Sequence, residues 1–250
     1  MTSSQSVKQS SLPLPPPSQQ WLPKPTTEVF DGFGSGQASP GSGSAAAFMG
    51  LLAAKLIITV CLKSIEKSND EEKTKAFHYL TQECHKHYDG LRELFEADAV
   101  EFRQVVDLRK QRDTAATSDD KAKFQRLANE GLEKTSGYVL QIMDRCRQLA
   151  QHGLVVFKDG WQYVQGDSGA AVSAAIGGIL SGIFIINLNL KSLRSRQFAR
   201  DNAQKTQEWY AIVEELQSKA FGHVATLNLE TLKAIQLELP TEAAPPSEQQ

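Results

Sequence analysis

The chain has 250 residues, of which 22% are charged and 40% hydrophobic, and its formal net charge is -2. This length suits one globular domain with a sizeable core, and the near-neutral charge argues against nucleic acid as the main partner. The three cysteines are an odd number and lie in apolar helical patterns, which predicts free thiols in a reducing compartment and a cytoplasmic protein.

The two ends of the chain differ in composition from the rest. Residues 1–28 are rich in Ser, Gln and Pro and have no apolar segment of the secretory type, which predicts a disordered tail, with a transit peptide as the alternative. Residues 240–250 predict a second disordered tail. Between them we expect one helical domain over residues 29–222 and a short segment over residues 223–239.

Apolar residues recur every three or four positions through most of this domain, which is typical of amphipathic helices. The pattern predicts an all-α bundle of about five long helices. A weaker apolar pattern at 227–239 is compatible with a docked helix or a strand. The predicted helices cover residues 45–65, 70–110, 118–157, 167–193 and 194–216.

The stretch from Gly169 to Leu190 carries no charge over about 22 residues, which is long enough to cross a bilayer. A helix at the centre of a soluble bundle is equally apolar all round. Its many Gly, Ala and Ser residues would allow close helix packing in either setting. Both interpretations stay open from composition alone.

Two carboxylates have unusual positions. Asp98 fills the gap between Phe95 and Phe102 on the buried stripe of its helix, where burial would alter its proton affinity. Asp167 stands at the start of the apolar helix. The structural alternatives are an ion pair or helix-end contact for Asp98 and a simple N-cap for Asp167.

A glycine-rich turn precedes the first long helix. Gly41 and Gly43 allow tight backbone geometry, and Ser44 is a natural N-cap, so free amides could face an electron-rich ligand there. Cys84 belongs to a core stripe, whereas His85 and His87 point in other directions and are expected in solvent. We therefore expect no metal site.

Four segments also match a known pattern. Residues 38–47 read Ala-Ser-Pro-Gly-Ser-Gly-Ser-Ala-Ala-Ala, residues 167–171 read Asp-Ser-Gly-Ala-Ala, and residues 189–193 read Asn-Leu-Lys-Ser-Leu. Asp98 is followed by an alanine and, three positions later, by Phe102. In this order the segments resemble the cyclodeaminase/cyclohydrolase family of folate enzymes, which comprises formimidoyltetrahydrofolate cyclodeaminases and methenyltetrahydrofolate cyclohydrolases.

The resemblance implies a soluble helical bundle that dimerises and buries its small-residue helix. It implies Asp98 and Asp167 as catalytic carboxylates and a tetrahydrofolate derivative as substrate, bound by Gly41, Ser42, Gly43, Ser44, Asn189 and Lys191. Lys191 is the candidate for the anionic folate tail.

The sequence also departs from the family pattern at three places. Ser42 replaces the middle glycine of the glycine-rich signature, and residues 109–112 read Arg-Lys-Gln-Arg in place of Lys-Leu-Pro-Lys. Residues 185–187 read Ile-Ile-Asn in place of Asn-Val-Arg, so a polar residue and a cation are lost.

The sequence thus predicts a one-carbon enzyme that either hydrolyses methenyltetrahydrofolate or cyclises formimidoyltetrahydrofolate with release of ammonia. We expect Asp98 and Asp167 to lie together beside the glycine-lined pocket of a cytoplasmic homodimer or larger homo-oligomer, with no metal and no nucleic acid. The alternatives are a non-catalytic assembly or partner-binding protein with the same fold, and a membrane-associated helical protein.

Overall fold

The computed structural model describes residues 12 and 14–238, and the expected tail segments 1–11 and 240–250 lie outside this part. The described residues form α-helices joined by turns and two short 3-10 segments, without a β-strand among them. The predicted all-α class is confirmed.

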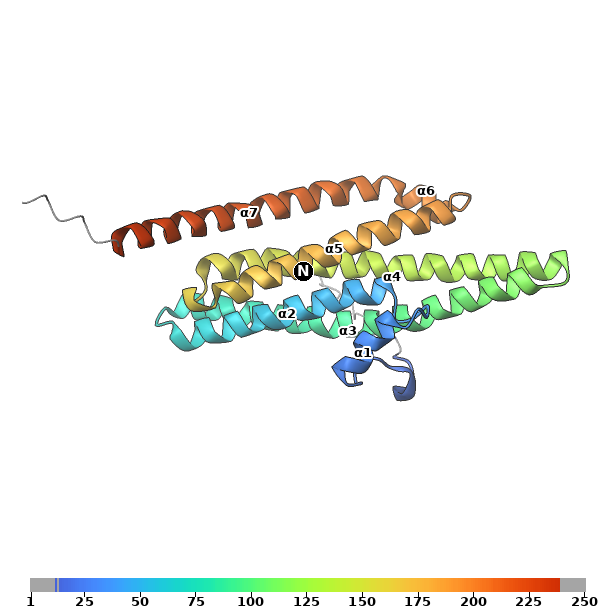
Figure 1. The fold of residues 1–250 in the computed structure, drawn as a ribbon, viewed down its shortest axis with the longest axis horizontal. Helices are drawn as coiled ribbons and strands as arrows, with labels where there is room; N and C mark the ends of the chain where they lie inside the picture. Colours follow the sequence, from blue (N-terminus) through green and yellow to red (C-terminus); the bar gives the residue numbers. More distant parts are fainter. Residues whose placement is uncertain (1–11, 13, 239–250) are drawn as a thin grey trace, which may run out of the picture.

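Four long helices form the body of the molecule and lie along a common axis (Figure 1). Each packs against its two neighbours in chain order around a four-sided bundle, since the first and last of them also contact each other. The four are α2 (Ser42–Lys67), α3 (Glu71–Thr114), α4 (Ser118–Asp159) and α5 (Gln165–Ser192).

Side chains at the helix starts explain where α3 and α4 begin. The Asp70 carboxylate accepts hydrogen bonds from the Glu72 and Lys73 amides at 3.0 and 3.1 Å. Thr117 caps α4 in the same way, and Asp119 and Asp120 provide acidic side chains in its first turn. These oxygens satisfy amides that have no partner within the helix.

The small residues of α5 allow it to approach α2 and α4 closely. A Cβ atom at Gly178 would lie 2.8 Å from Cys146 Sγ on α4 and 3.1 Å from the Ala46 carbonyl oxygen on α2. Ile179 and Ile186 are fully buried in the same core. The predicted buried small-residue helix is therefore confirmed.

Two helices, α2 and α5, are long and apolar enough to cross a membrane by length and composition alone. In α2, 56% of the most apolar window is buried inside the bundle, and the corresponding value for α5 is 50%. Core helices of soluble proteins pass the same test.

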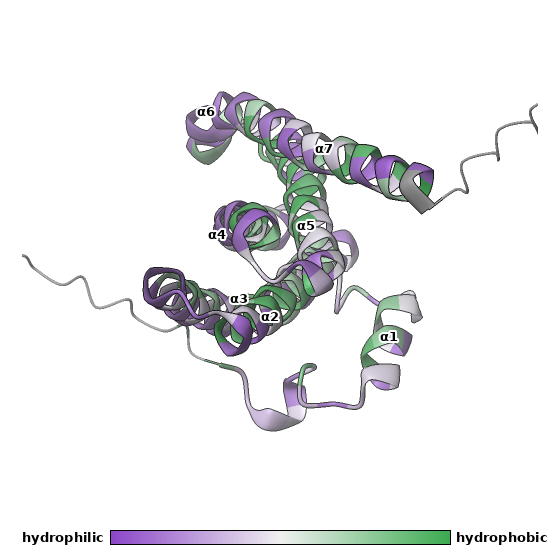
Figure 2. Ribbon diagram, turned by 90° about the vertical axis from the view of Figure 1, so that its left-hand side faces the viewer, coloured by the Kyte–Doolittle hydropathy of each residue, from purple (hydrophilic) through white to green (hydrophobic). Residues whose placement is uncertain are grey.

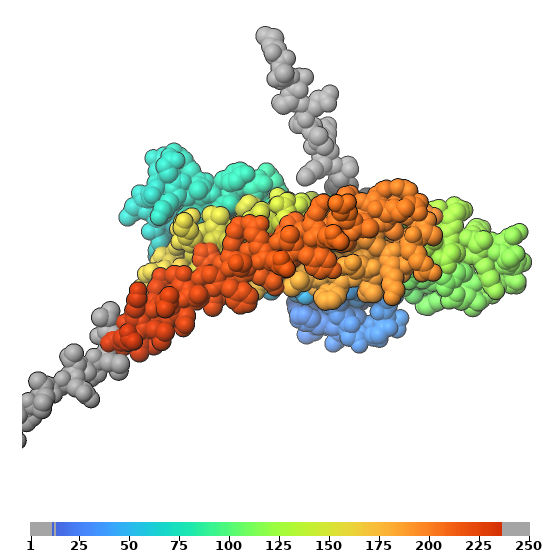
Figure 3. Space-filling view, turned by 90° about the horizontal axis from the view of Figure 1, so that it is seen from above, coloured from blue at the N-terminus to red at the C-terminus, as the bar shows by residue number. Residues whose placement is uncertain are grey.

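Three further helices surround the bundle: α1 (Thr26–Gly34), α6 (Gln197–Ala203) and α7 (Lys205–Glu238). α7 lies over α5 and runs past the end of the bundle (Figures 1 and 3). The weak pattern at 227–239 continues α7 up to Glu238, but its residues 224–236 are exposed and do not dock on the bundle.

The N-terminal segment 14–25 differs from the expected disordered tail because it packs against α3. The Trp21 and Leu22 amides donate to the Glu96 carboxylate at 2.8 and 2.7 Å. Glu96 is 2% exposed, so this is a buried anchor. In the end view the segment and α1 lie beside the bundle (Figure 2).

Candidate active site

Asp98 of α3 lies inside the bundle near the start of α2. It is 4% exposed, and its Oδ2 accepts a hydrogen bond from Ser44 Oγ at 3.0 Å. Burial raises the pKa of Asp98 to about 6, and the hydrogen bonds from Ser44 oppose this rise. The predicted burial of Asp98 agrees with the structure. Of its two structural alternatives, an ion pair is absent among the described residues, whereas the helix-end contact is present, because Asp98 lies against the first turn of α2.

The glycine-rich turn brings the first turn of α2 onto this carboxyl group. A Cβ atom at Gly43 would lie 2.6 Å from Asp98 Cγ, so only glycine fits there. The helix begins at Ser42 with Gly41 as its N-cap. Ser44 was expected to be the cap, but it lies within the first turn and is fully buried, so its hydroxyl bonds to Asp98 instead.

A small cavity of about 20 Å³ adjoins Asp98. This is room for about one water molecule. Asn189 of α5 reaches the cavity and its Nδ2 donates to Ser136 Oγ at 3.0 Å. The lining comes from the start of α2 and from α3, α4 and α5, namely Gly41, Ser42, Gly43, Asp98, Phe102, Thr135, Val139, Ile185 and Asn189.

Sequence reasoning did not identify the contribution of α4 to this cavity. Thr135 is 1% exposed, and its hydroxyl donates to the Leu132 carbonyl oxygen at 3.2 Å. The adjacent polar pair Thr135 and Ser136 on a buried helix face was the available signal.

Asp167 does not join Asp98 within one chain. It lies in the first turn of α5, whereas Asn189 lies in the last, and the 22 residues between them span about 33 Å at 1.5 Å per residue. The expectation that the two aspartates meet in one protomer is wrong, because α5 is a single uninterrupted helix. Asp167 is also not the N-cap, since α5 begins at Gln165 after Val164. Lys191 is exposed and does not line the cavity.

The departures from the family pattern affect the cavity unequally. Ser42 is exposed, and the glycine that packs against the Asp98 carboxyl group is Gly43, which the chain retains. Ile185 lines the cavity where the family pattern has a polar residue. Asn187 is exposed, and its Nδ2 donates to the Ile183 carbonyl oxygen at 2.8 Å.

The two histidines considered above, His85 and His87, differ in their exposure to solvent. His85 is exposed, but His87 is 6% exposed, so the expectation that both lie in solvent is wrong for His87. Its ring lies 5.8 Å from that of His152 because α3 and α4 pack face to face there. No cluster of three His, Cys, Asp or Glu side chains with metal-site geometry was found in the described part of the chain.

Comparison with known proteins identifies the family. The family model described as formiminotransferase-cyclodeaminase matches residues 25–208. The chain belongs to this family. The match begins one residue before α1 and ends near the start of α7, and therefore includes the whole four-helix body.

Two similar proteins bear on the family assignment. The chain is 29% identical over 188 residues to a methenyltetrahydrofolate cyclohydrolase of Methylorubrum extorquens, and this covers 72% of the chain and 86% of that relative. It also shares its fold with the crystal structure of a formiminotetrahydrofolate cyclodeaminase from Thermotoga maritima, with a TM-score of 0.70 and 15% identity. That comparison covers 82% of this chain and 97% of the other.

Proposed function

We propose that the chain is a folate-dependent one-carbon enzyme that hydrolyses methenyltetrahydrofolate. The observation that carries the proposal is the buried Asp98, which faces a water-sized cavity at the glycine-rich start of α2 and has a pKa of about 6. Such a carboxyl group can exchange a proton near neutral pH, which is the requirement for general acid–base catalysis.

The proposed reaction needs a water molecule beside an electron-poor carbon. The methenyl carbon bridges two folate nitrogens and shares their positive charge. The water oxygen bonds to this carbon while Asp98 takes the water proton. This leaves a hydroxyl group on the carbon. The bond from the carbon to one nitrogen then breaks while the hydroxyl oxygen forms the carbonyl and its proton passes to that nitrogen. A formyl group stays on the other nitrogen, and Asp98 releases the first proton to solvent. The Asp98 carboxylate also stabilises the cationic carbon by its charge.

Cyclodeamination of formimidoyltetrahydrofolate is the second candidate, favoured by the family's description. Here Asp98 would act first as an acid, delivering a proton to the departing ammonia while the second nitrogen attacks the one-carbon unit. The two reactions need opposite starting states of Asp98, so their pH dependence separates them.

We assign substrate binding to the start of α2 and the end of α5. The amides near Gly41 and Gly43 belong to the positive N-terminal end of α2, which would face the folate ring. Ser42 is exposed at the same turn. Ser44 orients Asp98, and Asn189 offers its side-chain oxygen beside the cavity. Lys191 is an exposed cation two residues later that attracts the anionic substrate.

We further propose that the active unit is a homodimer formed through an apolar face on α5, with no other macromolecule as a required partner. Phe184 and Leu188 of α5 are 72% and 66% exposed. Large exposed apolar side chains on one contiguous face are typical of an interface. The α5 face consists of Ala170, Ser173, Gly177, Ser181, Phe184 and Leu188, all exposed or half-buried.

A dimer formed through this face would bring Asp167 of the second protomer close to the Asp98 cavity of the first. The α5 face is centred midway along α5, and a twofold axis through its centre would run the two α5 helices antiparallel. The partner's Asp167 would then lie opposite the Asn189 end of the first chain. We therefore propose Asp98 of one protomer and Asp167 of the other as the catalytic carboxylates.

The setting of the proposed enzyme is the cytoplasm, in keeping with three buried free cysteines. The deciding experiment follows the loss of methenyltetrahydrofolate absorbance with the purified chain and with Asp98→Asn. Turnover by the wild type that is abolished in the variant supports the proposal. Equal turnover removes the role of Asp98, and a wild type that turns over neither methenyl- nor formimidoyltetrahydrofolate favours a non-catalytic protein of the same fold. Extraction of the expressed chain only with detergent would instead favour a membrane-associated protein.

A further inference from the structure

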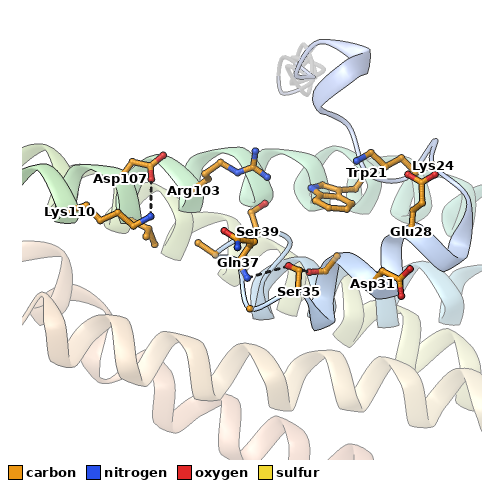
Figure 4. Close-up of a pocket in the computed structure, with 14 residues that line it drawn as sticks. Trp21, Lys24, Glu28, Asp31, Ser35, Gln37, Ser39, Arg103, Asp107 and Lys110 are labelled. Carbon is orange, nitrogen blue, oxygen red and sulfur yellow. Dashed lines mark hydrogen bonds and ion pairs between the residues drawn. The ribbon is translucent and has the colours of Figure 1, made fainter.

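A large open pocket lies outside the bundle between α1, α3 and the turn that leads to α2. Its volume is about 840 Å³, which is within the range of small-molecule sites. The lining side chains come from these three segments and from the chain just before α1 (Figure 4). They include Trp21, Lys24, Ser39, Arg103, Asp107 and Lys110.

Ser39 provides a polar group that has no partner within the described part of the chain. It is 3% exposed, it lines the pocket, and its hydroxyl makes no hydrogen bond there. A buried hydroxyl without a hydrogen-bond partner destabilises the fold. A ligand that accepts a hydrogen bond from Ser39 would remove this penalty.

Trp21 forms an aromatic wall that is held in place from two sides. Its amide donates to Glu96 at 2.8 Å, and its six-membered ring packs against α1, where a Cβ atom at Gly32 would lie 2.7 Å from Trp21 Cη2. Lys24 Nζ lies 4.0 Å from the ring centroid. A rigid indole of this kind favours a flat ligand.

The charged groups are unevenly distributed along the pocket. Arg103 forms no ion pair within the described residues, whereas Lys110 lies 3.6 Å from Asp107. Arg103 and Ser39 both line the pocket, and in Figure 4 they are drawn between Trp21 and Asp107, while the acidic Glu28 and Asp31 are drawn beyond Trp21. One end therefore combines a free cation with a free hydroxyl, the pair of donors that suits a carboxylate.

The lining of the pocket and the lining of the Asp98 cavity include neighbouring residues of the sequence. On α3, Phe102 lines the Asp98 cavity and the next residue, Arg103, lines the pocket. In the turn that leads to α2, Gly41 lines the Asp98 cavity and Ser39 lines the pocket. Arg103 is about 7.5 Å along α3 from Asp98 at 1.5 Å per residue. The cavity at Asp98 holds about 20 Å³, so most of a folate must lie outside it.

We infer that this pocket binds the p-aminobenzoyl-glutamate arm of the folate substrate, an identification that rests on the proposed function. The aminobenzoyl ring lies against Trp21, and a glutamate carboxylate accepts hydrogen bonds from Arg103 and Ser39. Trp21 and Lys24 precede the family-model match, which begins at residue 25, so this wall is an addition to the matched region.

The test combines calorimetric titration of p-aminobenzoyl-glutamate, which lacks the pterin, with kinetics on methenyltetrahydrofolate. Arg103→Gln should weaken the fragment about tenfold or more, because it removes a charged hydrogen-bond donor. It should raise KM by a similar factor with kcat unchanged, since the arm is bound equally in ground and transition states. Trp21→Phe tests the wall in the same way. Lys121→Gln, an exposed charge change on α4, is the matched control.

Each outcome separates this inference from the proposed function. A wild type that turns over substrate, with Arg103→Gln and Trp21→Phe unchanged in KM and in fragment affinity, overturns the pocket assignment and leaves the function intact. If Lys191→Gln weakens fragment affinity or raises KM more than Arg103→Gln does, the inference is also overturned, because the glutamate carboxylate would then bind at the end of α5. A wild type without turnover refutes the function, and the fragment titration then decides the pocket by itself. Circular dichroism checks that each variant is folded.

Discussion

Replacing Asp98 by asparagine should make the protein more stable and less active at the same time. The side chain keeps its size and can still accept the hydrogen bond from Ser44 Oγ. It loses only the ability to carry a charge or move a proton. A residue kept solely for structure would not respond in these opposite directions.

The magnitude follows from the pKa of Asp98, which burial raises from 3.8 to about 6. At about 1.4 kcal/mol per pKa unit, the buried carboxylate destabilises the fold by up to about 3 kcal/mol at neutral pH. The folded protein binds the proton more tightly than the unfolded chain does. The cost is therefore fully present above about pH 6, declines as the pH falls, and disappears below about pH 4.

The assay is urea unfolding of the wild type and Asp98→Asn at pH 7.5 and pH 4, at one protein concentration. The variant should gain up to about 3 kcal/mol at the higher pH and almost nothing at the lower one. Asp89→Asn, an exposed change on the same helix, serves as the control and should show no such difference.

Turnover should fall about a hundred- to ten-thousand-fold in the same variant. The reasoning is refuted if Asp98→Asn is less stable than the wild type at pH 7.5, or if its advantage is equal at both values of pH. Either result would mean that the carboxyl group is not desolvated in the folded protein.

Four further predictions concern the catalytic unit. Gly43→Ala should abolish turnover because its methyl group would displace the Asp98 carboxyl group, whereas Gly34→Ala, with open space around it, should retain full activity in the same assay. If Asp98 acts as the base, kcat/KM for hydrolysis should rise about tenfold per pH unit up to about pH 6 and then level off; a fall through that range indicates the acid role instead. A refolded mixture of inactive Asp98→Asn and inactive Asp167→Asn chains should regain roughly a quarter of wild-type activity, since half of the dimers then hold one intact site. No recovery would show that the two aspartates do not form a shared site between protomers. Phe184→Glu should shift the protein to monomers in light scattering, and an unchanged oligomer would show that the α5 face is not the interface.

The positions of α2 to α5 and the burial of Asp98 could be predicted because both depend on local periodicity, whereas α1 was missed and the predicted helix 194–216 is divided between α6 and α7. Apolar residues spaced three or four apart face one direction in any helix, so a carboxylate on that stripe is carried inward with them. The small residues of α5 likewise indicated close packing, and Gly178 contacts both α2 and α4.

The conformation of the segment before α1 could not be predicted in this way. Its Ser-, Gln- and Pro-rich composition indicated disorder, yet residues 14–25 lie against α3. The decisive contacts run from the Trp21 and Leu22 amides to Glu96, more than 70 residues away. No local pattern records a partner at that separation.

By itself the sequence determined the all-α class, the family and the burial of Asp98, because helical periodicity and short motifs are local properties of the chain. Only the tertiary structure decided that Ser44 bonds to Asp98 instead of capping α2, that His87 is buried, and that Asp167 lies a full helix length from Asp98. These are relations between separate helices. They depend on helix length and on which faces meet, and residue order along one helix does not contain them.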